Sequence, residues 1–228
     1  MTARPRQLAL ALEHAERLGA EDFLVAPTNA QAHALVTAWP HWPARALLVL
    51  GPPGAGKTHL AAIWAARTGA EIIPADSLDP EALPALHQNV MLAVEDVDRP
   101  HVSERALFHL LNGAGEAGAA LLLTAREPPG AAWPALPDLA SRLRRLPQAV
   151  LAAPEDALIR AVLVKLFADR QLVVEPGVIE YIFTRMERSL ATARRLVAAL
   201  DQEALARGRR VGRVLAAEVL AEIGEDDG

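Results

Sequence analysis

Short apolar runs alternate with amphipathic stretches along the first two thirds of the chain. Pro, Gly or Asp bounds each apolar run, a pattern typical of buried strands in a parallel sheet. We therefore expect strands at Ala46–Leu50, Glu71–Ile73, Val90–Val94, Ala119–Thr124 and Ala149–Ala152. Helical patterns lie before and between them, at Gln31–Ala38, His59–Ala66, Glu104–Gly113 and Leu139–Leu146. This order predicts an α/β fold, a five-stranded parallel sheet with helices on both faces.

After Pro154 the pattern contains helices alone. Apolar stripes predict helices at Glu155–Arg170, from Pro176, at Ser189–Arg207 and, more weakly, at Val214–Ile223. Gly208 is a natural stop for the third of them. We expect an N-terminal tail (residues 1–20), an α/β domain (residues 21–153) and a small all-α lid domain (residues 154–228).

Residues 51–58 read Gly-Pro-Pro-Gly-Ala-Gly-Lys-Thr and fit the pattern G-x-x-x-x-G-K-[ST] between a strand and a helix. Glycines let successive backbone N–H groups point into one concavity, and the following helix adds its positive end. Lys57 would reach the β- and γ-phosphates, and the Thr58 hydroxyl would bind Mg²⁺. The order of strand, loop, Lys-Thr and helix disfavours a loop that binds nothing. The predicted nucleotide-binding residues are Gly51, Pro52, Pro53, Gly54, Ala55, Gly56, Lys57, Thr58 and His59.

Two carboxylates end the apolar run that begins at Val90. Glu95 is the candidate Mg²⁺ ligand, and Asp96 could orient the attacking water. A solvated turn is the alternative. Glu before Asp is an unusual order, which leaves the rate of hydrolysis open. Thr124 ends the next strand and would lie beside the γ-phosphate.

Arginines stand at two further places. Ser141 to Arg145 contains three arginines before the last strand, and could be a solvated helix face or carry an arginine finger. Arg194 and Arg195 lie on the third helix of the small domain, where one could fold onto the nucleotide.

Composition narrows the function classes. A net charge of −5 and a pI near 5.8 argue against a surface built for phosphate backbones, so we expect no direct specific DNA binding. The absence of cysteine excludes disulfides and zinc-thiolate sites. No apolar run approaches the roughly 18 residues of a membrane span, so we expect a cytoplasmic protein without membrane contact.

Together these residues resemble AAA+ ATPases, and within them the DnaA/Hda family. Residues 22–29 are similar to the family's adenine-side box, which implies that Phe23, Leu24 and Val25 contact the nucleotide. Residues 123–129 are similar to its sensor 1 strand and Pro-Pro exit. Residues 139–143 resemble its box VII and residues 194–202 its sensor 2 helix, which implies an arginine finger at Arg142 and a sensor arginine at Arg194.

The tail carries one more feature of this family. Gln7-Leu8-Ala9-Leu10-Ala11-Leu12 is similar to the Q-L-x-L-x-L peptide by which Hda members bind the sliding clamp. Gln7 could hydrogen-bond at the rim of an apolar groove, and Leu8, Leu10 and Leu12 could enter it. An amphipathic start to the first helix is the alternative. We also expect no DNA-binding domain, because the chain stops where that of the initiator would begin.

The resemblance implies a regulator that binds the DNA polymerase III sliding clamp (β subunit) and stimulates ATP hydrolysis by DnaA, preventing re-initiation. ATP or ADP with Mg²⁺ would be its ligand, and it could form homo-oligomers. Two departures from the family are the Glu95-Asp96 pair and Arg126, where a small acidic or polar residue is usual. The finger could be Arg142 or a neighbouring arginine. An AAA+ helicase-loader-like factor and a small-molecule P-loop kinase are the alternatives.

Overall fold

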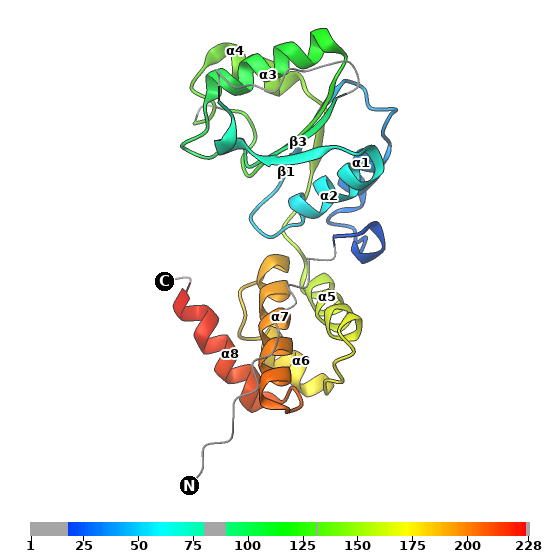
Figure 1. The fold of residues 1–228 in the computed structure, drawn as a ribbon, viewed down its shortest axis with the longest axis vertical. Helices are drawn as coiled ribbons and strands as arrows, with labels where there is room; N and C mark the ends of the chain where they lie inside the picture. The colour runs from blue at the N-terminus through cyan, green and yellow to red at the C-terminus, as the bar shows by residue number, and fades with distance from the viewer. Residues whose placement is uncertain (1–17, 80–89, 131, 227–228) are drawn as a thin grey trace. The chain divides into compact units, whose positions relative to one another are not determined.

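The computed structural model describes residues 18–79, 90–130 and 132–226, which form two units (Figure 1). The first unit is an α/β domain that ends at Ala153. The second begins at Pro154 and is entirely helical in its described part. None of the described helices is long and apolar enough to cross a membrane.

A five-stranded parallel sheet forms the centre of the α/β unit, as predicted. The strand order is β2-β3-β4-β1-β5. The strands are β1 (Ala46–Leu50), β2 (Glu71–Pro74), β3 (Met91–Glu95), β4 (Ala120–Ala125) and β5 (Gln148–Val150). β1 and β4 are buried at every position, because each has a strand on both sides and helices on both faces.

Side chains of β1 alternate between two apolar layers. Leu48 packs in a cluster with buried residues of α3 (Glu104–Ala117) and α4 (Pro137–Arg145). Leu47 and Val49 pack on the opposite face, against α1 (Ala30–Thr37) and α2 (Lys57–Thr68). Figure 1 shows the two helix pairs on either side of the sheet. The unit also contains two short 3₁₀ helices, η1 (Ala20–Asp22) and η2 (Ala75–Ser77).

The two edge strands differ from the prediction. The run at Glu71–Ile73 was expected to be a buried strand, but β2 is mostly exposed because its described pairing is with β3 alone. β5 begins one residue before the predicted Ala149 and ends at Val150. Its predicted end at Ala152 is wrong because the Ala152 N–H turns away to donate to the Thr28 carbonyl (3.1 Å).

The helical unit contains α5 (Asp156–Asp169), α6 (Pro176–Phe183), α7 (Leu190–Arg207) and α8 (Arg213–Asp226). α7 packs against both α5 and α8 through buried residues such as Leu196 and Leu200. The Ser189 hydroxyl caps its start by accepting the N–H groups of Ala191 and Thr192. Gly208 ends it in the left-handed conformation, as predicted.

Candidate nucleotide site

The phosphate loop (residues 51–58) joins β1 to α2 at the carboxyl edge of the sheet. The Gly51 N–H donates to the Ala125 carbonyl at the end of β4 (3.2 Å). A Cβ on Gly51 would lie 2.8 Å from both the Cβ and the carbonyl oxygen of Leu151, so no larger residue fits there. Gly56 has a φ of +106° where the loop enters α2, a conformation that favours glycine.

Lys57 is buried within this loop, with 7% of its surface exposed. Its Nζ donates to the carbonyl oxygens of Gly51 (2.7 Å) and Pro52 (3.0 Å). Burial lowers the pKa of Lys57, and the nearby carboxylate of Asp96 opposes that shift. The loop thus supplies its own partners for the ammonium group, which would otherwise be desolvated and unpaired.

Glu95 lies at the end of β3, close to the loop. Burial raises the pKa of its carboxyl group, and a hydrogen bond with Thr58 lowers it in part. Within the described residues, Oε1 of Glu95 is buried and has no hydrogen-bond partner. The two predicted Mg²⁺ ligands are therefore adjacent, and an oxygen of one of them is buried without a donor.

These two side chains fit a Mg²⁺ ion. Mg²⁺ in nucleotide sites is held by one or two protein oxygens, substrate phosphates and water. The described part of the chain has no group of three or more acidic, His or Cys side chains that could hold a metal alone. Glu95 and Thr58 would therefore share the ion with nucleotide oxygens.

Asp96 and Thr124 are held together by a direct hydrogen bond. Asp96 has a φ of +57°, and its N–H donates to the buried Thr124 Oγ1 (2.9 Å). The carboxylate of Asp96 pairs with Arg99. Thr124 therefore fixes the backbone after Glu95, a role that the sequence alone did not reveal.

Phe23 packs beside the phosphate loop. Its ring stacks on His33 (5.2 Å between centroids) and meets His59 edge-on (5.1 Å). A Cβ on Gly56 would lie 3.6 Å from the Phe23 ring. His59 is buried in α2, with Nε2 at 2.9 Å from the Gly19 carbonyl oxygen.

The next two predicted adenine-side residues lie in the segment before α1, which Asn29 stabilises. Leu24 is half-buried and Val25 is 56% exposed. The buried Asn29 side chain accepts from the Ala26 N–H (2.8 Å) and donates to the Leu24 carbonyl (3.0 Å). Sequence reasoning did not assign Asn29 a role. The sequence did contain a signal for it, because Asn is common just before a helix and Asn29 precedes the helical run.

Asp98 is a second residue that sequence reasoning missed. Its Oδ2 accepts the N–H groups of Arg126 (2.8 Å) and Glu127 (3.1 Å), which links the segment after β3 to the end of β4. Its Oδ1 is buried without a partner in the described residues. The sequence contained a signal for this residue, because Asp98 is the third carboxylate of Glu95-Asp96-Val97-Asp98.

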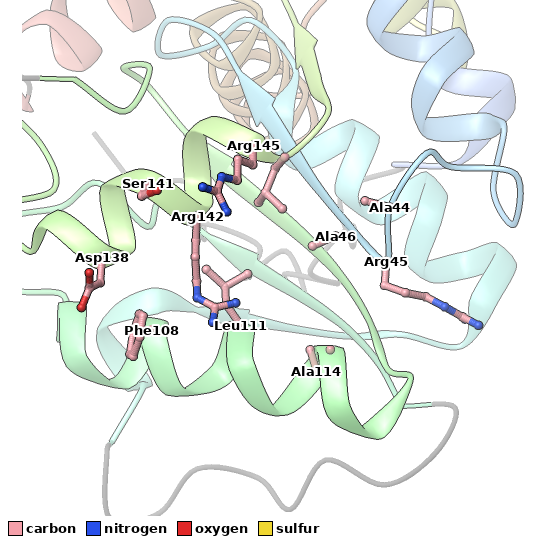
Figure 2. Close-up of a pocket in the computed structure, with 12 residues that line it drawn as sticks. Ala44, Arg45, Ala46, Phe108, Leu111, Ala114, Asp138, Ser141, Arg142 and Arg145 are labelled. Carbon is pink, nitrogen blue, oxygen red and sulfur yellow. The ribbon is translucent and has the colours of Figure 1, made fainter.

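Arg142 lies elsewhere in this unit, on α4, with its guanidinium 5.3 Å from the Phe108 ring centre on α3. Figure 2 shows it above Phe108 and Leu111 in a cavity of about 640 Å³ between α3, α4 and the start of β1. Ala46 lines this cavity, whereas the phosphate loop follows the other end of β1, about 16 Å along the strand. Arg142 therefore does not lie at the phosphate loop of its own chain.

The remaining predicted residues lie outside the described part of the α/β unit. Arg194 is half-buried on α7, in the helical unit, and its contact with a nucleotide stays a prediction. The tail residues Gln7, Leu8, Leu10 and Leu12 lie outside the described residues.

No family model and no curated protein matches the sequence. In structure, the chain resembles domain III of the replication initiation protein DnaA from Thermotoga maritima, with a TM-score of 0.73 and 18% identity over 91% of this chain and 97% of that one. It also resembles a replication initiator DnaA bound to AMPPCP and single-stranded DNA (TM-score 0.65, 18% identity, 85% of this chain and 68% of that one).

A third similar structure is the RuvB Holliday junction branch migration motor of Thermotoga maritima. The TM-score is 0.61 and the identity 18%, over 85% of this chain and 66% of that one. At these identities the comparisons show the fold alone. That fold agrees with the parallel sheet and with the helical region after it. The chain therefore has the α/β fold of the AAA+ P-loop ATPases, followed by a small helical region.

Proposed function

We propose that this chain binds an adenine nucleotide with Mg²⁺ at the phosphate loop. Two observations support this: Lys57 is buried, and Oε1 of Glu95 is buried without a hydrogen-bond partner among the described residues. Phosphate and metal would offset the cost of burying these two side chains. The bound AMPPCP of a structurally similar DnaA supports adenine as the base.

Different residues of the chain would bind different parts of the nucleotide and its metal ion. Backbone N–H groups of the loop and the start of α2 would receive the phosphates, and Lys57 would neutralise the two outer ones. Glu95 and Thr58 would hold Mg²⁺, which when bound offsets phosphate charge. Thr124 would keep the backbone of Asp96 in place beside them.

We further propose that the chain acts on a partner ATPase, as an Hda-like regulator that stimulates hydrolysis of ATP bound to DnaA. The observation that carries this is the position of Arg142, exposed on α4 at the end of the sheet opposite its own phosphate loop. An arginine finger supplied from there would neutralise charge on the transferring phosphoryl group of a neighbouring molecule. The likeness to DnaA domain III favours DnaA as the partner.

The test compares Arg142→Ala with Arg67→Ala, which removes the same charge from an exposed residue at the far end of α2. With DnaA-ATP and clamp present, we expect Arg142→Ala to abolish stimulated hydrolysis and Arg67→Ala to retain it. Equal stimulation by wild type and Arg142→Ala would place the finger elsewhere, at Arg144 or Arg145 first. Failure of the wild type to bind DnaA would contradict the regulatory proposal.

Recruitment would depend on the tail. Replacing Gln7 and Leu8 by Ala should remove clamp binding in a pull-down while leaving nucleotide affinity unchanged, because these residues precede the domain that holds the loop. Nucleotide binding is checked separately by calorimetry, where Lys57→Ala should lose it. Equal binding by that variant would contradict the nucleotide assignment.

A further inference from the structure

A cluster of arginines lies at the turn that joins α7 to α8 in the helical unit (Figure 1). Residues 207–213 read Arg-Gly-Arg-Arg-Val-Gly-Arg, with four arginines and no acidic residue. Val211 is buried, so it anchors the turn to the core of the helical unit. All four arginines around it are exposed. The turn therefore presents its positive charges to solvent from a fixed backbone.

Carboxylates of the described residues neutralise one of these four arginines. Arg207 Nε donates to Glu203 Oε2 (2.6 Å), and its Nη1 pairs with Glu218. Within the described part of the chain, no hydrogen bond or ion pair is found for the guanidinium groups of the other three, Arg209, Arg210 and Arg213. The turn thus has an excess of positive charge after its nearby carboxylates are counted, although the net charge of the chain is −5.

The four arginines line a cavity of about 190 Å³, together with residues at the start of α8. A water molecule takes up about 30 Å³ of liquid, so the cavity has room for a carboxylate group and a few waters. α8 begins with Arg213 and has no acidic residue in its first turn. The positive end of the helix dipole therefore adds to the charge of the arginines. A negatively charged group in the cavity would relieve this repulsion.

Apolar side chains flank the arginines at both ends of the turn. Leu205, in the last turn of α7, is 70% exposed, and Val214, in the first turn of α8, is 72% exposed. The sugar-phosphate backbone of a nucleic acid has no apolar side chain to cover them, whereas a protein segment can place acidic and apolar side chains next to each other. Charge and apolar surface together therefore favour a protein segment over a nucleic acid.

The acidic residues at the end of α8 cannot fill the cavity of their own chain. Glu225 and Asp226 stand about 20 Å from Arg213 along the helix. Glu203 and Glu218 are already paired with Arg207. The carboxylates that fit the remaining arginines must therefore come from elsewhere than these four residues.

We propose that the turn between α7 and α8 binds an acidic segment of a partner protein, in which Asp or Glu side chains alternate with apolar ones. Its carboxylates would pair with Arg209, Arg210 and Arg213, because the planar donors of arginine can bind both oxygens of a carboxylate. Its apolar side chains would cover Leu205 and Val214. Binding at this turn requires no nucleotide at the phosphate loop.

Fluorescence anisotropy of the full chain with a labelled peptide tests the proposal. The probe contains repeats of Asp-Glu-Leu, and the control peptide contains repeats of Asn-Gln-Leu, in which each carboxylate is replaced by an amide. At low salt, where exposed charges are least screened, we expect the acidic peptide to bind at least about tenfold more tightly than the amide peptide.

The decisive variant replaces the three arginines together, as Arg209→Gln, Arg210→Gln and Arg213→Gln. It should weaken binding of the acidic peptide at least about tenfold, because exposed ion pairs contribute about two- to fivefold each. The matched control removes three charges from exposed positions of the α/β unit and should bind like the wild type. Its substitutions are Arg45→Gln, Arg67→Gln and Arg105→Gln.

Four results would overturn the proposal. The wild type could bind the acidic and amide peptides equally, or the triple variant could keep wild-type affinity. A labelled oligonucleotide with the same number of charges could bind more tightly through the same three arginines, which would assign the turn to nucleic acid. Analytical ultracentrifugation could detect a dimer that the triple variant does not form, which would make a second copy of the chain the occupant. Thermal melts by circular dichroism check folding, and the single variants replace the triple variant if it unfolds.

Discussion

Glu95 and Lys57 place opposite charges in one buried corner of the α/β unit. Burial acts on both, since it raises the pKa of the carboxyl group and lowers the pKa of the ammonium group. Each charged form is therefore disfavoured relative to an exposed side chain. A nucleotide with Mg²⁺ would reverse both effects, because phosphate favours the ammonium ion and metal favours the carboxylate.

Glu95→Gln should make the nucleotide-free protein more resistant to heat at pH 8. A carboxyl group whose pKa is raised in the folded state contributes stability below its unfolded pKa and loses it as pH rises through the folded pKa. The difference in Tm between variant and wild type should therefore shrink as the pH falls from 8 to below the ordinary pKa of a glutamic acid, because the carboxyl group is then protonated in both the folded and the unfolded state. Differential scanning calorimetry across this range measures it, and a gap independent of pH would contradict the assignment.

Thr124→Val should destabilise the fold by about 1 to 3 kcal/mol, the usual cost of leaving a buried hydrogen-bonding group without its partner. The variant keeps the shape of the side chain but removes the acceptor of the Asp96 N–H. Urea denaturation measures the loss. Thr124→Ser keeps the hydroxyl and is the matched control, which should retain more stability than the Val variant.

Sequence analysis could propose roles for residues in contiguous patterns, and it missed contacts that depend on distant partners. The phosphate loop is a contiguous pattern, so it could be recognised in the sequence, and phosphate binding by Lys57 stays a prediction. Asp98 and Thr124 act through backbone groups 28 residues away or more, and that pairing exists only once β3 and β4 are neighbours. The hydrogen bonds from Lys57 to the carbonyl groups of its own loop could not be predicted either, because the sequence pattern describes a lysine that binds phosphate.

At the scale of elements, the apolar pattern located all five strands to within two residues at each end. β1 matches its predicted bounds, and β3 and β4 differ by one residue at each end, because burial on both faces demands continuous apolar runs. β2 ends one residue later than predicted, at Pro74, and β5 shows the largest difference from its predicted bounds. The end of β5 depends on Thr28, whose carbonyl takes the Ala152 N–H, so no local pattern could define it.

Gly51→Ala should disturb the junction between β1 and the phosphate loop. The added Cβ would lie 2.8 Å from backbone and side-chain atoms of Leu151, so the chain after β5 must shift. We expect a loss of about 1 to 3 kcal/mol, typical of overpacking, together with weaker nucleotide binding. Gly69→Ala is a control for an added methyl group, since no atom lies within 4 Å of its Cβ, although its positive φ carries a strain of its own. Equal nucleotide affinity in Gly51→Ala and the wild type would show that the junction tolerates the shift.

At the scale of the whole molecule, the net charge of −5 bears on the alternative of a factor acting on nucleic acid. We expect no tight binding of duplex DNA, with a Kd weaker than about 1 μM at physiological salt. Fluorescence anisotropy with a labelled duplex measures this. A submicromolar Kd that rises steeply with salt would favour a helicase-loader-like role over regulation of a partner.

The aromatic cluster beside α2 gives the protein an optical property. Trp64 lies on α2, two turns after Lys57. Its ring stacks on Trp42 (5.2 Å between centroids), and the Trp42 ring meets Trp39 edge-on (4.9 Å between centroids). Trp133 packs with the opposite face of the sheet. Emission from the three clustered indoles is therefore coupled to the start of α2, and a shift of that helix would alter their excitonic and quenching interactions. If the proposed nucleotide binding shifts α2, intrinsic fluorescence would follow that binding in real time, without a label.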